Sequence, residues 1–387
     1  MRPTRYRGSL QESRRYGDSR LWRNLPRPYM IAIVHVISIR RRLLVLTVAA
    51  GLLAGAPLRA ADNLVLARFA DYLESLRIQT GVPALVAVMT GTNDIAWERP
   101  FGYQDVDRLL TARPDTPFHF DGLTQTTTAA LILRYAEEGR INLDDPLERY
   151  VPGSPEGTTT IRQILTHTSP DGTYAYRPQR YNLLGPIIEW CAGYALRGRY
   201  SRLFNQFAMA DSVPGADVVE LASSPDGIVQ SDLARYPGVL ARLAVPYAVD
   251  SRGRPSPSQY PARTLRGSSG LIATARDYAK FDLGLRSFVV LNPATLAQAW
   301  TAPAGRDGRP LPHGLGWFVQ NYNGEKIVWQ FGQGDNASSS LVIVVPGRGM
   351  ALVLVANSDG LAKGVGLENG DLTTSPFGKL FLGLFVR

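Results

Sequence analysis

The sequence predicts an α+β fold, an α/β sandwich in which one antiparallel sheet is built from both chain ends and flanked by helices. Two β-rich runs near the start, VPALVAVMTG and IAWERPFGY, are joined by turn residues. Four more come late, namely GLGWFVQNYN, EKIVWQFG, SSSLVIVVPG and MALVLVANS, and glycine, asparagine and proline signals separate them. Helical spacing between the two groups predicts an inserted helical lobe, with a ligand cleft between the lobe and the sheet.

Hydrophobic spacing also places the main helices and the domain limits. LVLARFADYLESLRI, which follows Asn63, has the spacing and length of a helix, and so has the run from Thr126 to Glu138. PFGKLFLGLFV predicts a closing helix. We expect one domain over residues 61–387, with its sheet part at about 61–120 and 265–387 and its helical lobe at about 125–264.

The positive charge of the chain is concentrated near its start. The whole chain has 42 basic and 33 acidic residues, a formal net charge of +9. Residues 1–60 hold twelve arginines and two acids, which leaves 30 basic and 31 acidic residues in the rest. Because that rest is close to neutral, the basic composition does not indicate nucleic-acid binding.

The first sixty residues have the order of a leader and signal peptide. Arginines 40–42 precede the apolar run LLVLTVAAGLLAGAPL, and LRA supplies small residues before a cut after Ala60. This predicts an exported protein, periplasmic or secreted, with no stable membrane span after cleavage. An N-terminal membrane anchor is the alternative, although the run is short for a spanning helix. Met30 is an alternative start to Met1.

Neither the cysteine nor the histidine pattern predicts a metal or a cofactor. Cys191 is the single cysteine of the chain, has no disulfide partner, and is expected to be a small buried hydrophobe. His119 and His313 lack metal-ligand spacing with each other or with a pair of acids. The oligomeric state stays open.

Several stretches occur in a familiar order: EEGRINLDDPLERYVP, TIRQILTHTS, YNLLGPIIE, GSSGLIATARDYAKF, GLGWFVQ and VWQFGQGDNASSSLVIVVPGRGMALVLVANSDG. Through their order and spacing, the chain from about Phe69 onward resembles the serine β-lactamase and penicillin-binding protein family, in its class C and D-alanyl-D-alanine-peptidase-like branch. The resemblance implies a β-lactamase/transpeptidase-like fold.

The resemblance also implies three catalytic motifs around the cleft. The first is S-x-x-K at a helix N-terminus, where the lysine takes the proton of the serine nucleophile. The second is Tyr-x-Asn, whose tyrosine shares in the proton transfer. The third is Lys-Thr-Gly or His-Thr-Gly on a strand that lines the cleft. Backbone N–H groups at the nucleophile and on that strand form the oxyanion hole.

This chain departs from all three motifs. FHFDGLTQ matches the segment that leads into S-x-x-K, and it places Gly122 at the nucleophile position and Gln125 at the lysine position. Tyr176 stands at the tyrosine position, but Pro178 replaces the asparagine. The third motif falls on Gln330, Phe331 and Gly332, and Gln333 is the residue whose N–H would join the oxyanion hole. Glycine cannot be acylated, and glutamine cannot act as a general base.

Of the catalytic side chains that the resemblance implies, this chain therefore retains Tyr176 alone. We expect ligand contacts from Gly122, Gln125, Gln330, Gly332 and Gln333. The threonines at 124 and 126–128 carry hydroxyls, but none is followed by a lysine three residues later, so they are read as helix-start residues. His167, in LTHTSPDG, is expected in a turn.

Three functions stay open on these residues. The first is an exported pseudoenzyme that binds a carboxylate-bearing small molecule or a cell-wall-type peptide. The second is an active β-lactamase, peptidase or esterase with a rearranged nucleophile and Tyr176 as its base. The third is a structural or partner-binding protein whose cleft is closed. Whether the protein is an enzyme depends on Gly122 and Gln125, the positions where the nucleophile and lysine are missing.

Overall fold

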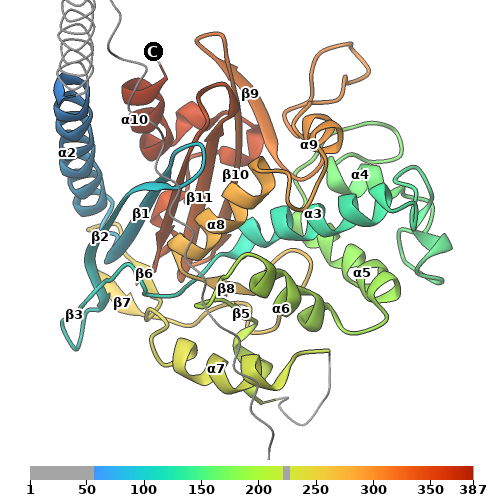
Figure 1. Cartoon of the computed structure of the whole chain (residues 1–387), viewed down its shortest axis with the longest axis horizontal. Coiled ribbons are helices and arrows are strands. Elements are labelled where there is room, and N and C mark those ends of the chain that lie inside the picture. The colour runs from blue at the N-terminus through green and yellow to red at the C-terminus, as the bar shows by residue number, and fades with distance from the viewer. Residues whose placement is uncertain (1–55, 221–226, 387) are drawn as a thin grey trace, which may run out of the picture. The chain divides into compact units, whose positions relative to one another are not determined.

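A seven-stranded antiparallel sheet forms the centre of the molecule (Figure 1). The computed structural model describes residues 56–220 and 227–386, with side chains from residue 63 onward. The strand order is β3-β2-β1-β12-β11-β10-β9. The strands are β1 (Ala84–Thr90), β2 (Ile95–Asp105), β3 (Leu110–Thr111), β9 (Phe318–Tyr322), β10 (Glu325–Gly334), β11 (Ser338–Val345) and β12 (Met350–Ala356).

The two ends of the chain meet at the centre of this sheet, as the sequence predicts. Strand β1 pairs with β12 in a register that runs from Leu85 opposite Ala356 to Thr90 opposite Ala351. Both strands consist almost wholly of buried apolar residues. A strand with this pattern must be covered on both faces, so helices are required on each side.

Helices cover the two faces of the sheet and complete the predicted sandwich. On one face, Val86 and Val353 belong to an apolar core shared with α3 (Thr124–Glu137) and α8 (Ala275–Arg286). On the other face, Leu354 shares a core with Phe69 of α2 and Phe381 of α10. Helix α2 spans Ala56–Gln79 and α10 spans Pro376–Phe385.

Capping and a buried ion pair hold α8 on the sheet. Thr274 caps its first turn by accepting a hydrogen bond from the Asp277 N–H. Near the other end, the Arg286 guanidinium lies 2.7 Å from Asp282 and donates to the Thr90 hydroxyl of β1. This pair is almost fully buried, so removal of either partner would leave an uncompensated charge in the core.

A helical lobe with small β elements lies beside the sheet. Its helices are α3, α4 (Ile161–Leu165), α5 (Gly185–Ala192), α6 (Leu196–Gln206) and α7 (Gln230–Leu240). A short sheet has the order β4-β8-β5, built from Phe118–His119, Leu271–Ala273 and Val213–Pro214, and β6 (Tyr247–Val249) pairs with β7 (Pro255–Pro257). Helix α9 (Pro293–Ala299) follows, and short 3₁₀ turns include η1 (Asp121–Leu123) and η3 (Pro178–Leu184).

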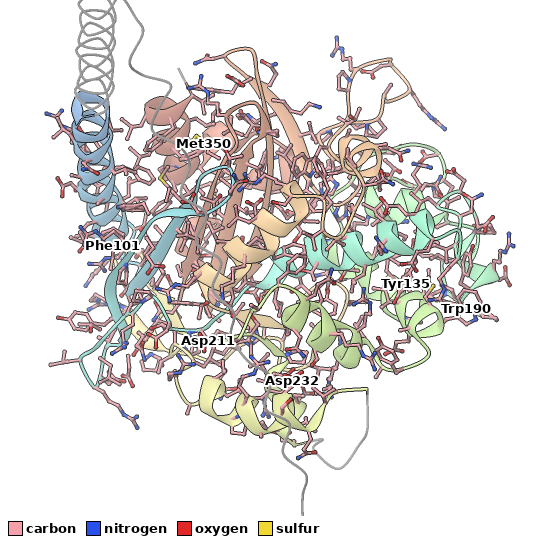
Figure 2. The ribbon with its side chains drawn as sticks, viewed as in Figure 1. Phe101, Tyr135, Trp190, Asp211, Asp232 and Met350 are labelled. Carbon is pink, nitrogen blue, oxygen red and sulfur yellow. The ribbon has the colours of Figure 1, made fainter. Side chains whose placement is uncertain are left out.

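Two acids, the buried Asp232 and the partly exposed Asp211, tie the elements of the lobe together (Figure 2). Asp232 of α7 accepts hydrogen bonds from Ser201 at 2.6 Å and from Asn205 at 2.8 Å, both on α6. Asp211 receives the Arg242 guanidinium at 2.6 Å. These charge-assisted bonds fix the α6–α7 packing from which the lobe is built.

Two helices begin earlier than the sequence pattern predicts. Helix α2 is already formed at Ala56, the first described residue, whereas the sequence pattern predicts a start near Asn63. Helix α3 starts at Thr124 instead of Thr126, because η1 runs straight into it and the Thr124 N–H already bonds the Asp121 carbonyl oxygen. Helix boundaries depend on such turns, which hydrophobic spacing does not report.

The predicted signal segment lies almost entirely outside the described residues. Within the described part, no helix is both long enough and apolar enough to cross a bilayer. Cys191 is buried and has no disulfide partner, as expected for the single cysteine of the chain.

Candidate ligand-binding cleft

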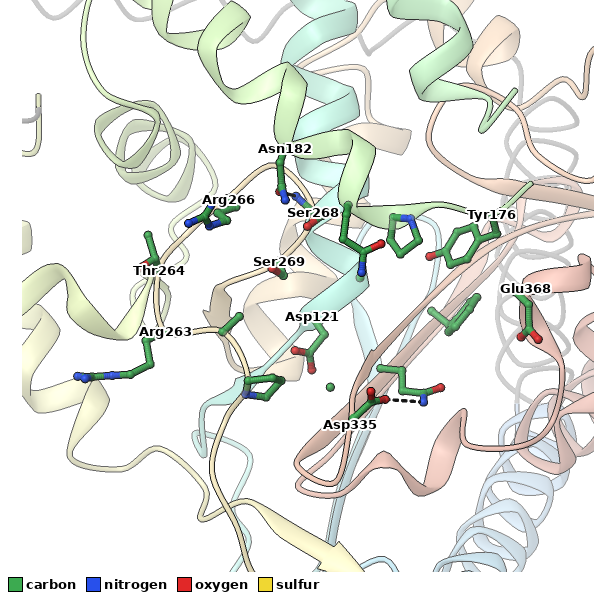
Figure 3. A pocket seen from close by; sticks show the side chains of 18 residues that line it. Asp121, Tyr176, Asn182, Arg263, Thr264, Arg266, Ser268, Ser269, Asp335 and Glu368 are labelled. Carbon is green, nitrogen blue, oxygen red and sulfur yellow. Dashed lines mark hydrogen bonds between the residues drawn. The ribbon is translucent and has the colours of Figure 1, made fainter. Parts of the chain in front are cut away.

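An open cleft of about 630 Å³ lies between the helical lobe and the end of β10 (Figure 3). Four stretches contribute most of its walls: η1, the segment from Tyr176 through η3, residues 261–269, and the end of β10 with the turn after it. This is the location at which the sequence places a ligand site. Gly122, Tyr176 and Gln333 line the cleft, whereas Gln125, Gln330 and Gly332 lie behind its surface.

The nucleophile position has no space for a serine. A Cβ atom built on Gly122 would lie 2.6 Å from the Phe331 carbonyl oxygen and 3.2 Å from the Gly332 Cα. The neighbouring atoms belong to the backbone of β10, so they cannot move aside as a flexible side chain could. A side chain at residue 122 therefore requires β10 to shift away from η1.

Further glycines allow β10 to pack directly on η1. A Cβ on Gly332 would lie 2.2 Å from the Phe120 carbonyl oxygen and 2.8 Å from the Gly122 nitrogen. A Cβ on Gly334 would lie 2.8 Å from Asp121 Oδ1. Gly332 is thus a packing residue, and the strand end of the third motif lies against the turn that precedes α3.

The lysine position is filled by a buried amide that binds the inherited tyrosine. Gln125 is fully buried, and its Nε2 donates to Tyr176 Oη at 2.9 Å. Because the phenol accepts this bond, its own hydrogen is free to be donated toward the cleft. Burial raises the pKa of Tyr176 well above its ordinary value, so the phenol stays protonated at neutral pH.

An aromatic and histidine cluster fixes the Tyr176 ring. The ring centroid lies 4.5 Å from that of His167 and 5.3 Å from that of Phe331. His167 has a left-handed backbone with φ of 53°, and its Nδ1 accepts from the Arg177 N–H at 3.2 Å. Burial lowers the pKa values of both His167 and His313, the latter to about 4, so both rings are neutral supports.

The remaining motif residues on β10 face in different directions. Gln330 is fully buried, with its Nε2 3.2 Å from His313 Nε2, and it does not reach the cleft. Phe331 lines the cleft instead. Gln333 is exposed on the cleft wall, and its Nε2 donates to Asp335 Oδ1 at 3.0 Å. Hence Gln333 is the one glutamine of this motif that a ligand can contact directly.

The structure places an acid in the cleft that the sequence analysis did not single out. Asp121 is only 3% exposed, has a left-handed backbone with φ of 43°, and accepts a hydrogen bond from the Ser338 hydroxyl. Burial, with a smaller contribution from nearby Asp335, raises its pKa to about 7, against the lowering effect of Ser338. One feature of the sequence could have identified it: Asp121 is the single acid in the stretch between Asp115 and Arg134, which contains no lysine or arginine.

The opposite wall carries two arginines. Arg263 pairs with Glu220, whereas the Arg266 guanidinium is exposed on the cleft and has no ion-pair partner among the described residues. Glu368 adds a third acid at the Tyr176 end of the cleft (Figure 3). No cluster of three or more metal-ligating side chains occurs in the described part of the chain.

The sandwich, the lobe and the cleft between them define the architectural class of serine β-lactamases and penicillin-binding proteins. The beta-lactamase family model matches residues 67–371. The chain therefore belongs to the beta-lactamase family, and the resemblance seen in the sequence is confirmed.

Solved structures support the same fold. The octameric penicillin-binding protein homologue from Pyrococcus abyssi superposes with a TM-score of 0.65 at 19% identity, covering 82% of this chain and 77% of that one. The class C beta-lactamase from Rhodobacter sphaeroides gives 0.58 at 17% identity, covering 75% of this chain and 94% of that one. These identities establish the fold alone.

The sequence relatives match over a short region. Protein flp of Staphylococcus aureus (strain NCTC 8325 / PS 47) is 32% identical over 94 residues, which are 23% of this chain and 19% of that protein. The match thus spans about a fifth of the relative's length.

Proposed function

We propose that this chain is an exported beta-lactamase-family pseudoenzyme that binds a carboxylate-bearing small molecule or a cell-wall-type peptide without acylation. One observation carries the proposal. The residue at the nucleophile position is a glycine, and the Phe331 carbonyl oxygen would lie 2.6 Å from any Cβ placed there. The site lacks the nucleophile, and it also lacks the volume that a nucleophile would occupy.

The proton acceptors of the family's reaction are also missing. Gln125 is neutral at every accessible pH, and the raised pKa of Tyr176 keeps that phenol protonated. No lysine or histidine lines the cleft within the described residues. An enzyme with a rearranged nucleophile needs a base hydrogen-bonded to a hydroxyl. Among the described residues that line this cleft, none of the acids Asp121, Asp335 and Glu368 accepts a hydrogen bond from a lining hydroxyl.

The cleft nevertheless keeps groups that bind a carboxylate. The guanidinium of Arg266 is exposed on its wall and forms no ion pair with a described residue. The Tyr176 hydroxyl is oriented by Gln125, so its hydrogen is available to a ligand oxygen. The open volume disfavours the closed-cleft alternative, in which the protein would serve only as a structural partner.

Export is part of the proposal and rests on the order of arginines, apolar run and small residues before Ala60. N-terminal sequencing of the protein recovered from the cell envelope or medium tests it. A mature chain that begins at Ala61 supports export, and one that retains residues 31–60 favours a membrane anchor.

Calorimetric titration with N-acetyl-D-alanyl-D-alanine tests the binding function. We expect reversible binding with one ligand per chain. Tyr176→Phe should weaken binding by the worth of one hydrogen bond, about 0.5–1.5 kcal/mol. Thr127→Ala is the control, because Thr127 is buried and does not line the cleft. If carboxylate-bearing peptides and β-lactams all fail to bind, the proposal is wrong and the structural alternative leads.

A further inference from the structure

The floor of the cleft is acidic, which the positions of the family motifs do not explain. Asp121 comes from η1, and Asp335 comes from the turn after β10. Figure 3 shows the two side chains near the centre of the cleft, between the wall that carries Arg263 and Arg266 and the side that carries Tyr176.

One oxygen of the Asp121 carboxylate is left without a partner. Oδ2 accepts the hydrogen bond from Ser338, whereas Oδ1 accepts none from any described residue. The side chain is 97% buried and lines the cleft. Oδ1 is thus held in place by a side chain that cannot move away from the cleft, and it is open to a hydrogen-bond donor carried by a ligand.

No cation of the described chain neutralises the two acids. Neither Asp121 nor Asp335 forms an ion pair with a described arginine or lysine, and Asp335 receives only the Gln333 amide at 3.0 Å. Arg263 is paired with Glu220. The floor therefore presents uncompensated negative charge to whatever occupies the cleft.

We propose that Asp121 and Asp335 bind a protonated amine of the ligand, so that the ligand is zwitterionic, with its carboxylate directed to the Arg266 wall. This inference rests on the reversible binding proposed above and names the chemical class of the ligand. An ammonium group supplies up to three donors, enough for Asp121 Oδ1 and a free oxygen of Asp335.

The charge of Asp121 makes this recognition depend on pH. Burial holds the pKa of Asp121 at about 7, and an ammonium group beside it would favour the carboxylate form. The other titratable groups around it are Asp335, Tyr260 and Tyr176. The pKa of each phenol is raised by burial, so neither titrates near neutrality. Amine binding should therefore strengthen between pH 5.5 and 7.5.

Three probes distinguish recognition of the amine from recognition of the carboxylate. D-Alanyl-D-alanine carries both charges, N-acetyl-D-alanyl-D-alanine carries only the carboxylate, and D-alaninamide carries only the amine. Titration at pH 7.5 should show both amine-bearing probes saturating the cleft. The free dipeptide should bind at least about tenfold more tightly than its acetylated form, and this preference should shrink at pH 5.5.

Asp121→Asn is the decisive variant, because asparagine tolerates the left-handed backbone and can still accept the Ser338 hydrogen bond. The preference for the free amine should fall to about twofold or less in this variant. Asp307→Asn, at an exposed aspartate outside the cleft, should retain it.

The outcomes are distinct for the two proposals. If the acetylated dipeptide binds as well as the free one, or if Asp121→Asn keeps the preference, the amine site is wrong while carboxylate binding stands. If D-alaninamide binds and the acetylated dipeptide does not, the amine site is supported and the carboxylate proposal fails. If neither amine-bearing probe binds, the amine site is wrong.

Discussion

The two halves of one continuous segment, residues 118–125 and 126–133, differ in how their buried polar groups are satisfied. In the second half, Thr126 donates to the Leu123 carbonyl oxygen at 2.7 Å and pairs with the Tyr278 hydroxyl at 2.7 Å. Thr128 donates to the Gly267 carbonyl oxygen at 2.7 Å and pairs with the Tyr200 hydroxyl at 2.6 Å. Every hydroxyl named here has a partner inside the fold.

The first half leaves polar atoms unpaired. Both ring nitrogens of His119, which stacks on Tyr260, and Oε1 of Gln125 are buried without a partner among the described residues. Asp121 adds a buried carboxylate with one free oxygen. Unsatisfied buried groups cost stability, so residues that keep them usually serve a function. We therefore call residues 126–133 the scaffold half, and we assign the unpaired groups of residues 118–125 to the ligand site.

The largest expected effect comes from restoring the family's nucleophile and base in the first half. Gly122→Ser combined with Gln125→Lys should lower the free energy of unfolding by about 4 kcal/mol or more, because the serine overpacks against β10 and the lysine charge is buried without a partner. Urea unfolding measures this loss. We expect no acylation by β-lactams in the double variant.

The matched control is Gly238→Ser in α7, where a Cβ would meet nothing within 4 Å. It should change the free energy of unfolding by less than about 1 kcal/mol, the scale of helix propensity. If the double variant is as stable as this control, β10 is not closed over residue 122 as the account requires.

The next effect concerns Asp121, whose removal should stabilise the protein at pH 8. Its folded pKa of about 7 lies above the ordinary 3.8, so its favourable contribution is present at acidic pH and is lost as pH rises through 7. At pH 8 Asp121→Asn should therefore raise the free energy of unfolding by up to about 4 kcal/mol, the free-energy equivalent of this difference in pKa. The gain should vanish near pH 4.

A substitution in the scaffold half should have the opposite effect on the free energy of unfolding. Thr128→Val removes the hydroxyl that bonds Tyr200 and the Gly267 carbonyl oxygen, and should cost about 1–3 kcal/mol at any pH between 5 and 8. Thermal unfolding of the Asp121→Asn and Thr128→Val variants at pH 5 and at pH 8 distinguishes the two halves. A stability loss for Asp121→Asn at pH 8 would show that this acid belongs to the scaffold.

The fold could be predicted from the sequence because its signals are local. The buried runs that form β1 and β12 are apolar along almost their whole length, and such strands must lie in the centre of a covered sheet. The short turn η1 was missed, and with it the true start of α3, because a 3₁₀ turn that continues into a helix leaves no periodic signal.

The chemistry of the candidate site was less predictable, because it depends on contacts between distant parts of the chain. The absence of a serine at Gly122 and of a lysine at Gln125 can be read directly from the sequence. The lack of space at residue 122 cannot, because it depends on the Phe331 carbonyl oxygen of the distant strand β10. Strand alternation places Gln330 and Phe331 on opposite faces of β10, but it cannot tell which of them faces the cleft and which faces His313. Likewise, the burial of Asp121 depends on Ser338 from β11.

Intact-mass spectrometry after incubation with excess benzylpenicillin tests the proposal that the cleft has lost covalent chemistry. An active family member under the same conditions is the positive control. We expect a mass identical to that of the untreated protein at every time point. A stoichiometric adduct would contradict it, and peptide mapping of that adduct would identify the hydroxyl that serves as the nucleophile.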